Sequence, residues 1–470
     1  MKALIIIPKY ASRPVDYYNL PMGMLYLATA IRKQADVSIL NLNEILQQDV
    51  EHIIKRRVKN VDIVFTGGLS VHFMQIKDIL RMVRTYSKAK IVVGGGLVTS
   101  QPEIMSGLLK NVDVFIYGES DQLDIPNNCH FSQILIMNTV HKDILDITFP
   151  AYDLFNMDLY LALQRPSDSH YRAIINYPRE AAIIASRGCP YNCTFCFHPT
   201  GNTYRQRSLN SVFIEIEMLK EDYNINILSV YDECFAISKS RLTEFCERIK
   251  KLKLYWSCQL RVDGIDENDM KMLADSGCYI ISFGIESASD VILRNYKKNI
   301  TVKQINNALE WSKKAGIVVQ GNIILGAEEE TLDTVEESMK WWAEHKEFNL
   351  SVGPVIPYPG TEMYKRAVEK GLIDSKIFLE QGCPDVNCAE LDIIESNKII
   401  TKYLSQSFST IYDVCYESNL DNFGRVKLTF KNKCPYCDAV QIRENFSMDA
   451  VEEGVKWCNT CKGRYFLRKE

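Results

Sequence analysis

Three closely spaced cysteines are the residues of this 470-residue chain that are best suited to chemistry. Cys189, Cys193 and Cys196 follow the pattern C-x3-C-x2-C, directly after the apolar run 181–185. Soft thiolates at this spacing suit an iron-sulfur cluster, and a cubane with three protein ligands leaves its fourth iron open for a substrate or cofactor. A zinc knuckle is the alternative, because spacing alone does not identify the metal.

A second set of cysteines near the carboxyl end has the spacing of a different metal site. Cys434 and Cys437 form one C-x2-C pair, and Cys458 and Cys461 form another after twenty intervening residues. Four thiolates on two such knuckles give a closed tetrahedral site, whose metal would help to fold a segment too small for a core of its own. We expect zinc, with rubredoxin-type iron as the alternative, because the same ligands serve both metals.

The remaining cysteines are best explained as packing residues. Cys383, Cys388 and Cys415 could together hold a second cluster, but buried apolar thiols are the simpler interpretation. We expect five further cysteines in the core, namely Cys129, Cys234, Cys246, Cys258 and Cys278.

Composition indicates a soluble protein of two or three domains. Hydrophobic residues make up 46% and charged residues 24%, and no apolar run approaches membrane-spanning length. Met1 leads straight into a short strand-like run, so we expect no signal peptide and a cytoplasmic location. Fifteen cysteines in such a chain favour metal ligands and buried thiols over disulfides, and a reducing, anaerobic setting. The net charge of -4 argues against general nucleic-acid binding.

The first 125 residues alternate short β-branched runs with amphipathic stretches, which predicts a doubly wound α/β domain with ligands at the carboxyl ends of its strands. Glycines follow three of these strands: Gly67 and Gly68, then Gly94, Gly95 and Gly96, then Gly118 before Glu119. They would let the backbone approach a large flat ligand, although ordinary turns need glycine too. Predicted strands are 3–8, 37–40, 61–66, 90–94 and 112–117, and predicted helices are 22–33, 44–58 and 71–86.

Residues 126–175 show little periodicity and are expected to be a linker. Six strand-helix units follow within 176–375 and predict a partial (β/α)6 TIM barrel, whose working face is at the carboxyl ends of its strands. The three-cysteine loop follows the first of these strands. Residues 376–430 are expected to be an extension, and 431–470 a small four-cysteine ribbon. Predicted barrel strands are 181–186, 225–231, 255–261, 279–285, 318–325 and 350–356.

The three-cysteine loop and the segments at successive barrel strand ends resemble the signature of the radical S-adenosylmethionine (SAM) enzymes. After strands two to six these segments are 229–233, 259–263, 282–287, 322–326 with Glu329, and 357–361. The resemblance implies that the three cysteines hold a 4Fe-4S cluster. It also implies that SAM binds the open iron and is cleaved to a 5'-deoxyadenosyl radical.

The same resemblance implies a set of SAM contacts. Asp232 and Glu233 would lie near the amino group of SAM, although a helix cap would also explain them. Arg261 would pair with the SAM carboxylate or would anchor a loop carboxylate. The remaining implied contacts are hydrogen bonds from Glu286 and Ser287, and packing on the adenine by Phe195, Phe197 and Ile324.

The amino-terminal domain, joined to such a barrel, resembles the cobalamin-binding module of the cobalamin-dependent radical SAM group. The D-x-H-x-x-G sequence that supplies an axial histidine in mutase-type binders is missing. His72 would pass beneath the corrin, or it is an ordinary loop histidine, which we favour. The implied cobalamin contacts are Asn19, Gly68, Ser70, His72, Gly94, Gly95, Gly96, Gly118 and Glu119.

These resemblances imply cobalamin-dependent methylation of an unactivated carbon. A cobalamin-independent dehydration, rearrangement or epimerisation with a vestigial corrin domain is the alternative enzyme. A non-catalytic metal-binding adaptor is a more distant one, which the intact cysteine triad disfavours. We expect a small-molecule or peptide substrate, and an electron donor such as flavodoxin or ferredoxin.

Overall fold

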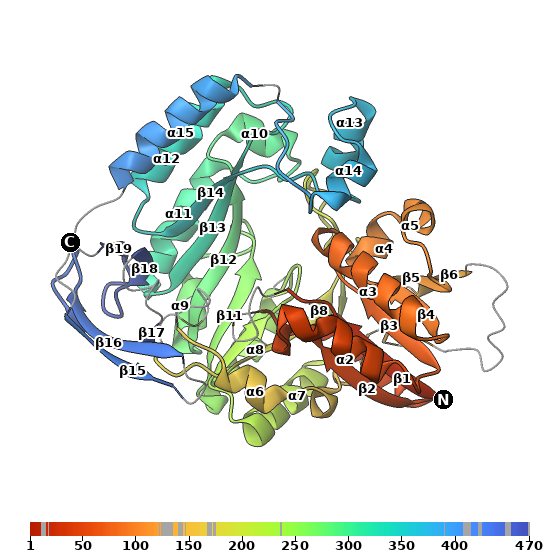
Figure 1. Ribbon diagram of the computed structural model, residues 1–470. Coiled ribbons are helices and arrows are strands. Elements are labelled where there is room, and N and C mark those ends of the chain that lie inside the picture. The colour runs from red at the N-terminus through yellow and green to blue at the C-terminus, as the bar shows by residue number, and fades with distance from the viewer. Residues whose placement is uncertain are drawn as a thin grey trace. The chain divides into compact units, whose positions relative to one another are not determined.

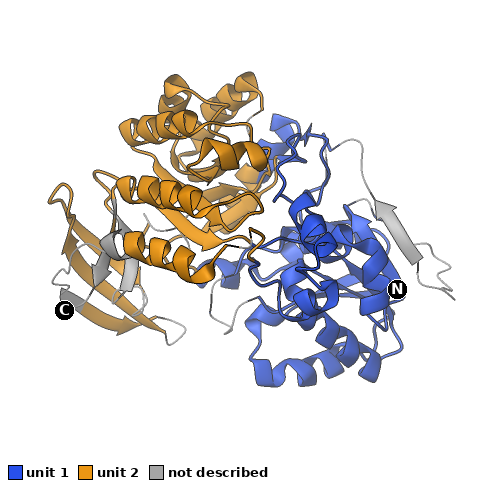
Figure 2. Cartoon of the chain, turned by 90° about the horizontal axis from the view of Figure 1, so that it is seen from above, with its two compact units in different colours: residues 1–163, 186–215, 356–386 blue, residues 164–185, 216–355, 387–470 orange. Residues whose placement is uncertain are grey.

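The computed structural model of the chain describes residues 1–10, 16, 18–121, 123, 135–139, 144–145, 147–166, 172, 175–235, 237–389, 391–407, 415–421, 425–446 and 453–468. They divide into two compact units (Figure 2). Residues 1–163, 186–215 and 356–386 form unit 1, and residues 164–185, 216–355 and 387–470 form unit 2. Cys129 lies outside the described residues, as does the side chain of Cys415.

The amino-terminal sheet of unit 1 is parallel throughout, which confirms the predicted doubly wound fold (Figure 1). A sixth strand, which the sequence did not predict, lies inside the expected linker and pairs with the fifth. In sheet order the strands are β2 (Asp36–Asn41), β1 (Lys2–Ile7), β3 (Ile63–Gly67), β4 (Lys90–Gly94), β5 (Val114–Gly118) and β6 (Leu135–Thr139). The helices are α1 (Met22–Ile31), α2 (Val50–Arg57), α3 (Phe73–Tyr86), α4 (Gly96–Ser100), α5 (Pro102–Leu108) and α6 (Met157–Ala162), with short 3-10 turns at Leu42–Glu44, Gln47–Asp49, Ser70–His72 and Tyr152–Leu154.

The order of this sheet reverses between β1 and β3, which is where a ligand is expected in a doubly wound fold. The turns that follow β3 and β4 approach each other closely. A Cβ on Gly67 would lie 2.2 Å from the carbonyl oxygen of Gly94. Gly95 has φ +84°, and a Cβ there would lie 2.9 Å from the oxygen of Gly68. These glycines are therefore required by the mutual packing of two turns as well as by turn geometry.

Unit 2 holds the predicted partial barrel, a six-stranded parallel sheet. Its helices begin and end where local chemistry requires. For example, the side chain of Thr301 accepts from the backbone N–H of Gln304 before α11, and Gly316 with φ +72° ends that helix. In sheet order the strands are β14 (Asn349–Pro354), β13 (Val318–Leu325), β12 (Cys278–Glu286), β11 (Tyr255–Leu260), β10 (Ile227–Val230) and β7 (Glu180–Ile183). The intervening helices are α7 (Leu209–Tyr223), α8 (Lys239–Leu252), α9 (Glu267–Asp275), α10 (Asp290–Asn295), α11 (Val302–Ala315) and α12 (Leu332–Glu344).

The carboxyl-terminal ribbon begins earlier in the sequence than the expected residue 431. Strands β15 (Cys415–Leu420), β16 (Val426–Lys433) and β17 (Val440–Phe446) form an antiparallel sheet, followed by the hairpin β18 (Glu453–Trp457) and β19 (Arg464–Arg468). The ribbon also has more apolar material than expected. Leu428, Phe430, Phe446 and Tyr465 are buried together with Cys434 and Cys458, so a small core supports the cysteine site.

Three helices lie between the barrel and this ribbon in sequence. These are α13 (Glu362–Glu369) and α14 (Ser375–Glu380) of unit 1, and α15 (Ile393–Ser407), which packs along α12 in unit 2 (Figure 1). Among the described residues, no helix has both the length and the hydropathy needed to span a membrane.

The contact between the two glycine turns gives a direct test. Gly67→Ala should destabilise the protein by about 1–3 kcal/mol, because the new Cβ would collide with a backbone oxygen that cannot move away as a side chain can. Gly107→Ala in α5 is the control, since nothing lies within 4 Å of its Cβ position, and it should be neutral or slightly stabilising. Thermal unfolding midpoints measure both, and equal midpoints would contradict the packing account.

Candidate active site

The three-cysteine loop is closed at its base by two short strands, β8 (Ser186–Arg187) and β9 (Arg205–Gln206), which pair antiparallel. Gly188 has φ +78°, and a Cβ there would lie 2.2 Å from the carbonyl oxygen of Thr203. The glycine before the first cysteine therefore lets the two sides of the loop meet. Backbone N–H groups of the cysteines fold the loop further, from Cys189 to Gly201 O at 3.3 Å and from Cys196 to Cys193 O at 3.1 Å.

The thiols of this loop are sheltered from solvent. Cys189 and Cys193 are buried, and Cys196 is half-buried. Three thiolates from one loop are the protein ligands that a 4Fe-4S cluster with one open iron needs, so the loop fits the expected cluster. The site itself stays a prediction.

Glu119, at the end of β5, joins the base of the cysteine loop to the amino-terminal sheet within unit 1. One carboxylate oxygen accepts from Arg187 at 3.1 Å and from Arg205 at 3.0 Å, and the other accepts from Arg205. Arg187 also donates to Asp121 at 2.8 Å. All four side chains are less than a tenth exposed. Both oxygens of Glu119 are thus bonded to arginines, and its expected contact with cobalamin stays a prediction.

Phe197 makes a second link between the cysteine loop and the glycine turns of unit 1. A Cβ on Gly360, which has φ +89°, would lie 2.6 Å from the Phe197 ring, and one on Gly96 would lie 3.7 Å from it. The ring therefore packs between the 94–96 turn and the 357–361 segment. Phe195 is half-buried in the same loop. Packing of either ring on an adenine stays a prediction.

His72 lies at the reversal point of the amino-terminal sheet. Its Nδ1 accepts from the backbone N–H of Leu69 at 3.1 Å, and its ring lies 4.3 Å from the ring of Tyr10. Burial lowers the pKa of His72 to about 4, so the ring is neutral and carries its proton on Nε2. Neither ring nitrogen then offers a lone pair to a metal, which supports the interpretation of His72 as an ordinary loop histidine.

The other expected cobalamin contacts are placed around this reversal point and the neighbouring turns. Ser70 is buried at the start of the 3-10 turn that carries His72, and Asn19 is exposed just before α1. Gly118 has φ +93°, and its N–H donates to Thr99 Oγ1 at 3.0 Å. The contacts of these residues with cobalamin stay predictions.

The remaining expected SAM contacts lie at the carboxyl ends of the barrel strands in unit 2. Asp232 is buried, and its Oδ1 accepts from the N–H of Ala185 at 2.7 Å, so it joins the end of β10 to the end of β7. Glu233 is half-buried beside it. The cap of α8 is Ser238, so the alternative that Asp232 or Glu233 caps a helix is not what this structure has.

Arg261 and Glu286 face a shared loop. Arg261 donates to both oxygens of Asp263 at 2.9 Å and to Lys298 O at 2.8 Å, which is the loop-anchoring alternative. Glu286 has φ +66° and accepts from Lys298 Nζ at 3.0 Å. Their contacts with SAM stay predictions. Because Lys298 contacts both side chains, we expect the two to be positioned together.

Ser287 and Ile324 are held by neighbouring side chains. The Ser287 hydroxyl is fully buried, lies 3.3 Å from the Ser338 hydroxyl and accepts from the N–H of Ser289 at 3.1 Å. The carbonyl of Ile324 accepts from the Tyr296 hydroxyl at 3.1 Å. Direct side-chain recognition of SAM by Ser287 would therefore require these bonds to be shared.

Glu330 is a residue at these strand ends that the sequence analysis missed. Its carboxylate accepts from the N–H of Gly326 at 2.5 Å and closes the turn after β13, where Gly326 has φ +96°. Burial raises its pKa to about 7, against the smaller opposing effect of backbone N–H groups. The sequence singled out Glu329, which is exposed. Three successive glutamates, 328–330, give no signal to tell which one folds inward.

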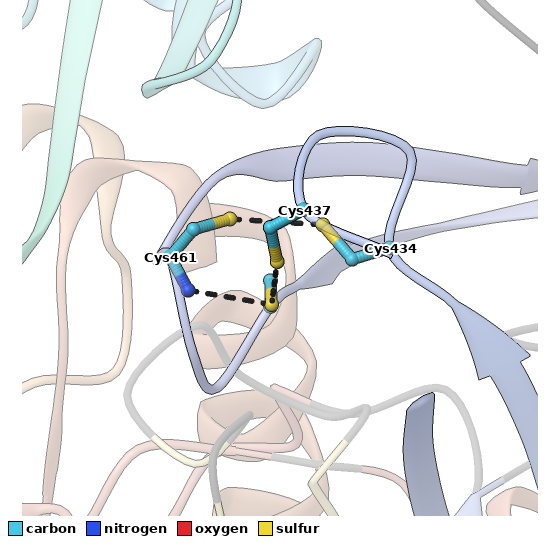
Figure 3. Close-up of side chains that lie close together, drawn as sticks. Cys434, Cys437 and Cys461 are labelled. Atoms are coloured by element: carbon cyan, nitrogen blue, oxygen red, sulfur yellow. Dashed lines mark hydrogen bonds between the residues drawn. The ribbon is translucent and has the colours of Figure 1, made fainter. Parts of the chain in front are cut away.

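The four ribbon cysteines form a separate metal-binding arrangement (Figure 3). Cys434 Sγ lies 3.6 Å from Cys461 Sγ, and Cys437 Sγ lies 3.5 Å from Cys458 Sγ. The N–H groups of Thr460 and Cys461 point at Cys458 Sγ, at 3.3 and 3.4 Å. Burial would raise the pKa of Cys458, but these bonds outweigh it and lower the pKa to about 7. Such a closely spaced thiolate set fits one tetrahedral ion.

The other cysteines behave as packing residues. Cys234, Cys246, Cys258, Cys278, Cys383 and Cys388 are all buried. Burial raises the pKa of Cys246 to about 12 and that of Cys383 to about 11, which keeps both as neutral thiols.

Comparisons with known proteins agree with both parts of this site. The Radical SAM superfamily matches residues 183–341, and the B12 binding domain matches residues 11–123. The chain is 27% identical to an uncharacterized methyltransferase of Pyrococcus horikoshii, over 79% of this chain and 84% of that one. It is 28% identical to the bacteriochlorophyllide d C-8(2)-methyltransferase of Chlorobaculum tepidum, over 61% and 64%.

Solved structures share the fold. The radical SAM methyltransferase TsrM of Kitasatospora setae, with cobalamin and a [4Fe-4S] cluster bound, superposes with a TM-score of 0.62 at 17% identity, over 79% of this chain and 78% of that one. The cobalamin-dependent radical enzyme OxsB gives 0.58 at 15% identity, over 88% and 62%. The chain therefore combines a radical SAM domain with an amino-terminal B12-binding domain.

The buried Glu330 makes stability depend on pH. Folding raises the pKa of Glu330 from 4.5 to about 7. The folded state therefore keeps the carboxyl proton up to a higher pH than the unfolded state does. Its stabilising contribution is complete below about pH 4.5 and is lost as the pH rises to about 7, by at most about 3 kcal/mol. Glu330→Gln should flatten the fall in thermal midpoint between pH 5 and 7.5. The exposed Glu329→Gln is the control, and an unchanged slope in Glu330→Gln would refute the assignment.

Proposed function

We propose that this enzyme methylates an unactivated carbon in a cobalamin-dependent reaction. The observation that carries the proposal is that the three-cysteine loop and the B12-binding fold belong to one compact unit and share buried ion pairs through Glu119. An enzyme that used the two cofactors in one reaction would need such a fixed relation. The similarity to methyltransferases of Pyrococcus horikoshii and Chlorobaculum tepidum supports the same reaction class.

When bound, the 4Fe-4S cluster with SAM supplies a 5'-deoxyadenosyl radical, and cobalamin supplies a transferable methyl group. In this proposal Cys189, Cys193 and Cys196 would hold the cluster. Arg261 and Glu286 would orient the charged and ribose groups of SAM, with Lys298 fixing both side chains. His72 supports the turn after β3 through its bond to Leu69 and does not bind cobalt.

A cobalamin-independent radical reaction is the second candidate. The specific observation in its favour is that the glycines of the amino-terminal sheet are already required by contacts between turns, so they do not by themselves demand a corrin. In that case the B12-binding fold would serve only as the support of the cysteine loop.

We further propose zinc for the four-cysteine ribbon, a cytoplasmic location, and an electron donor such as flavodoxin or ferredoxin. The closed set of four thiolates within 4.8 Å supports a structural ion.

The ribbon packs on the segment before β7 through Arg165, which donates to Asp421 and to Val426 O, each at 3.0 Å. Iron, zinc and cobalt analysis of the anaerobically purified protein tests these metals, and ribbon iron in place of zinc would refute that part.

The products of SAM distinguish the two candidate reactions. Reconstituted protein with a reductant should form 5'-deoxyadenosine, and should form S-adenosylhomocysteine only when cobalamin is supplied. Changing Cys189, Cys193 and Cys196 to alanine should abolish 5'-deoxyadenosine, because no cluster would be held, whereas Cys383→Ala should not. Chromatography of both nucleosides measures this. Undiminished 5'-deoxyadenosine in the triple variant would refute the cluster assignment. If the wild-type protein supplied with cobalamin forms 5'-deoxyadenosine but no S-adenosylhomocysteine, the cobalamin-independent reaction is favoured.

A further inference from the structure

The base of the cysteine loop carries two positive charges that the protein has to neutralise. Arg187 and Arg205 are directly opposed in the β8–β9 pair, and both side chains are buried. Like charges opposed across two strands repel, and burial strengthens the repulsion. An anion between the guanidinium groups therefore stabilises the strand pair that closes the loop.

Glu119 is that anion, and its contacts are specific. It accepts from Arg205 through both oxygens, which is the bidentate geometry that favours arginine over lysine, and one oxygen is shared with Arg187. Asp121 supplies the second negative charge through Arg187. Two cations thus face two anions, and removal of Glu119 alone would leave a buried positive charge at the base of the loop.

The other side of Glu119 leads to the glycine turns of the B12-binding fold. Glu119 directly follows Gly118, whose N–H donates to Thr99 in α4, the short helix that begins at the 94–96 turn. Direct bonds therefore run from the triglycine turn through Thr99 and Gly118 to Glu119, and from there to Arg187, two residues before Cys189. A ligand that moved the triglycine turn would therefore act, through these bonds, on the group that closes the base of the cysteine loop.

We propose that Glu119 is a positioning residue through which occupancy of the B12-binding fold sets the conformation of the cysteine loop. The inference rests on the proposed function, because it requires cobalamin to bind that fold. Glu119 touches neither cofactor in this account, and it acts through Arg187 and Arg205.

Hydrogen-deuterium exchange and 57Fe Mössbauer spectroscopy of the full-length, cluster-reconstituted protein test the proposal, each with and without hydroxocobalamin. Cobalt does not contribute to the 57Fe spectrum, which therefore reports the cluster environment alone. In the wild-type protein, cobalamin should slow exchange in residues 186–206 and should change the cluster spectrum. Compared at equal measured iron and cobalt content, Glu119→Gln should lose both responses, because the neutral amide cannot hold two cations together.

Glu215→Gln is the matched control, since Glu215 is an equally buried carboxylate paired with Arg207 and makes no bond to Arg187 or Arg205. It should keep both responses. Arg205→Lys retains the charge but loses the bidentate pair, so it should weaken both responses even if Glu119→Gln does not fold. Responses in Glu119→Gln or Arg205→Lys equal to the wild type would overturn the proposal. If the wild-type protein retains cobalamin but shows neither response, the Glu119 proposal is wrong and the proposed function still stands. If the wild-type protein retains no cobalamin, both the Glu119 proposal and the proposed function are wrong.

Discussion

A single buried carboxylate between two opposed arginines fixes the position of the cysteine loop. Glu119 neutralises Arg187 and Arg205, and these two residues are the pair that closes the loop. Removing one partner of a buried ion pair typically costs about 3–5 kcal/mol, because the remaining charge has no water to solvate it. The loop therefore cannot move away from the end of β5 without a large loss of stability. This constraint explains why residues 186–215 belong to the same compact unit as the B12-binding fold.

Close backbone packing supports the same arrangement. The two glycine turns touch through Gly67 and Gly94, the triglycine turn also contacts Phe197, and Gly188 brings the two sides of the cysteine loop together. The contacts at Gly67 and Gly188 exclude a Cβ, so glycine is required there by distances to segments further along the chain. The ribbon follows a different principle, since its thiolates and its small apolar core stabilise one another.

Much of the fold was predictable from sequence because its strands are short apolar runs that alternate with amphipathic helices. All eleven strands predicted for the amino-terminal sheet and the barrel are present near their expected boundaries, and each lies in a parallel sheet. Strand β6 was missed because three apolar residues followed by Asn138 and Thr139 do not stand out in an irregular segment. The role of Glu119 and the burial of Glu330 were missed for another reason: both depend on partners brought together only by folding, and neighbouring acidic residues look the same in sequence. Recognition of the three cysteines needed no partner, because their spacing is local.

Cobalamin retention tests the central claim, that one compact unit serves both cofactors, most directly. Full-length protein, reconstituted anaerobically and incubated with hydroxocobalamin, would be desalted and examined by visible absorption and by iron and cobalt analysis. The account predicts stoichiometric cobalt retained together with the cluster, and a corrin spectrum that His72→Gln leaves unchanged. A protein that retains no cobalamin while it still cleaves SAM would contradict the account and would leave the B12-binding fold as a support for the cysteine loop alone.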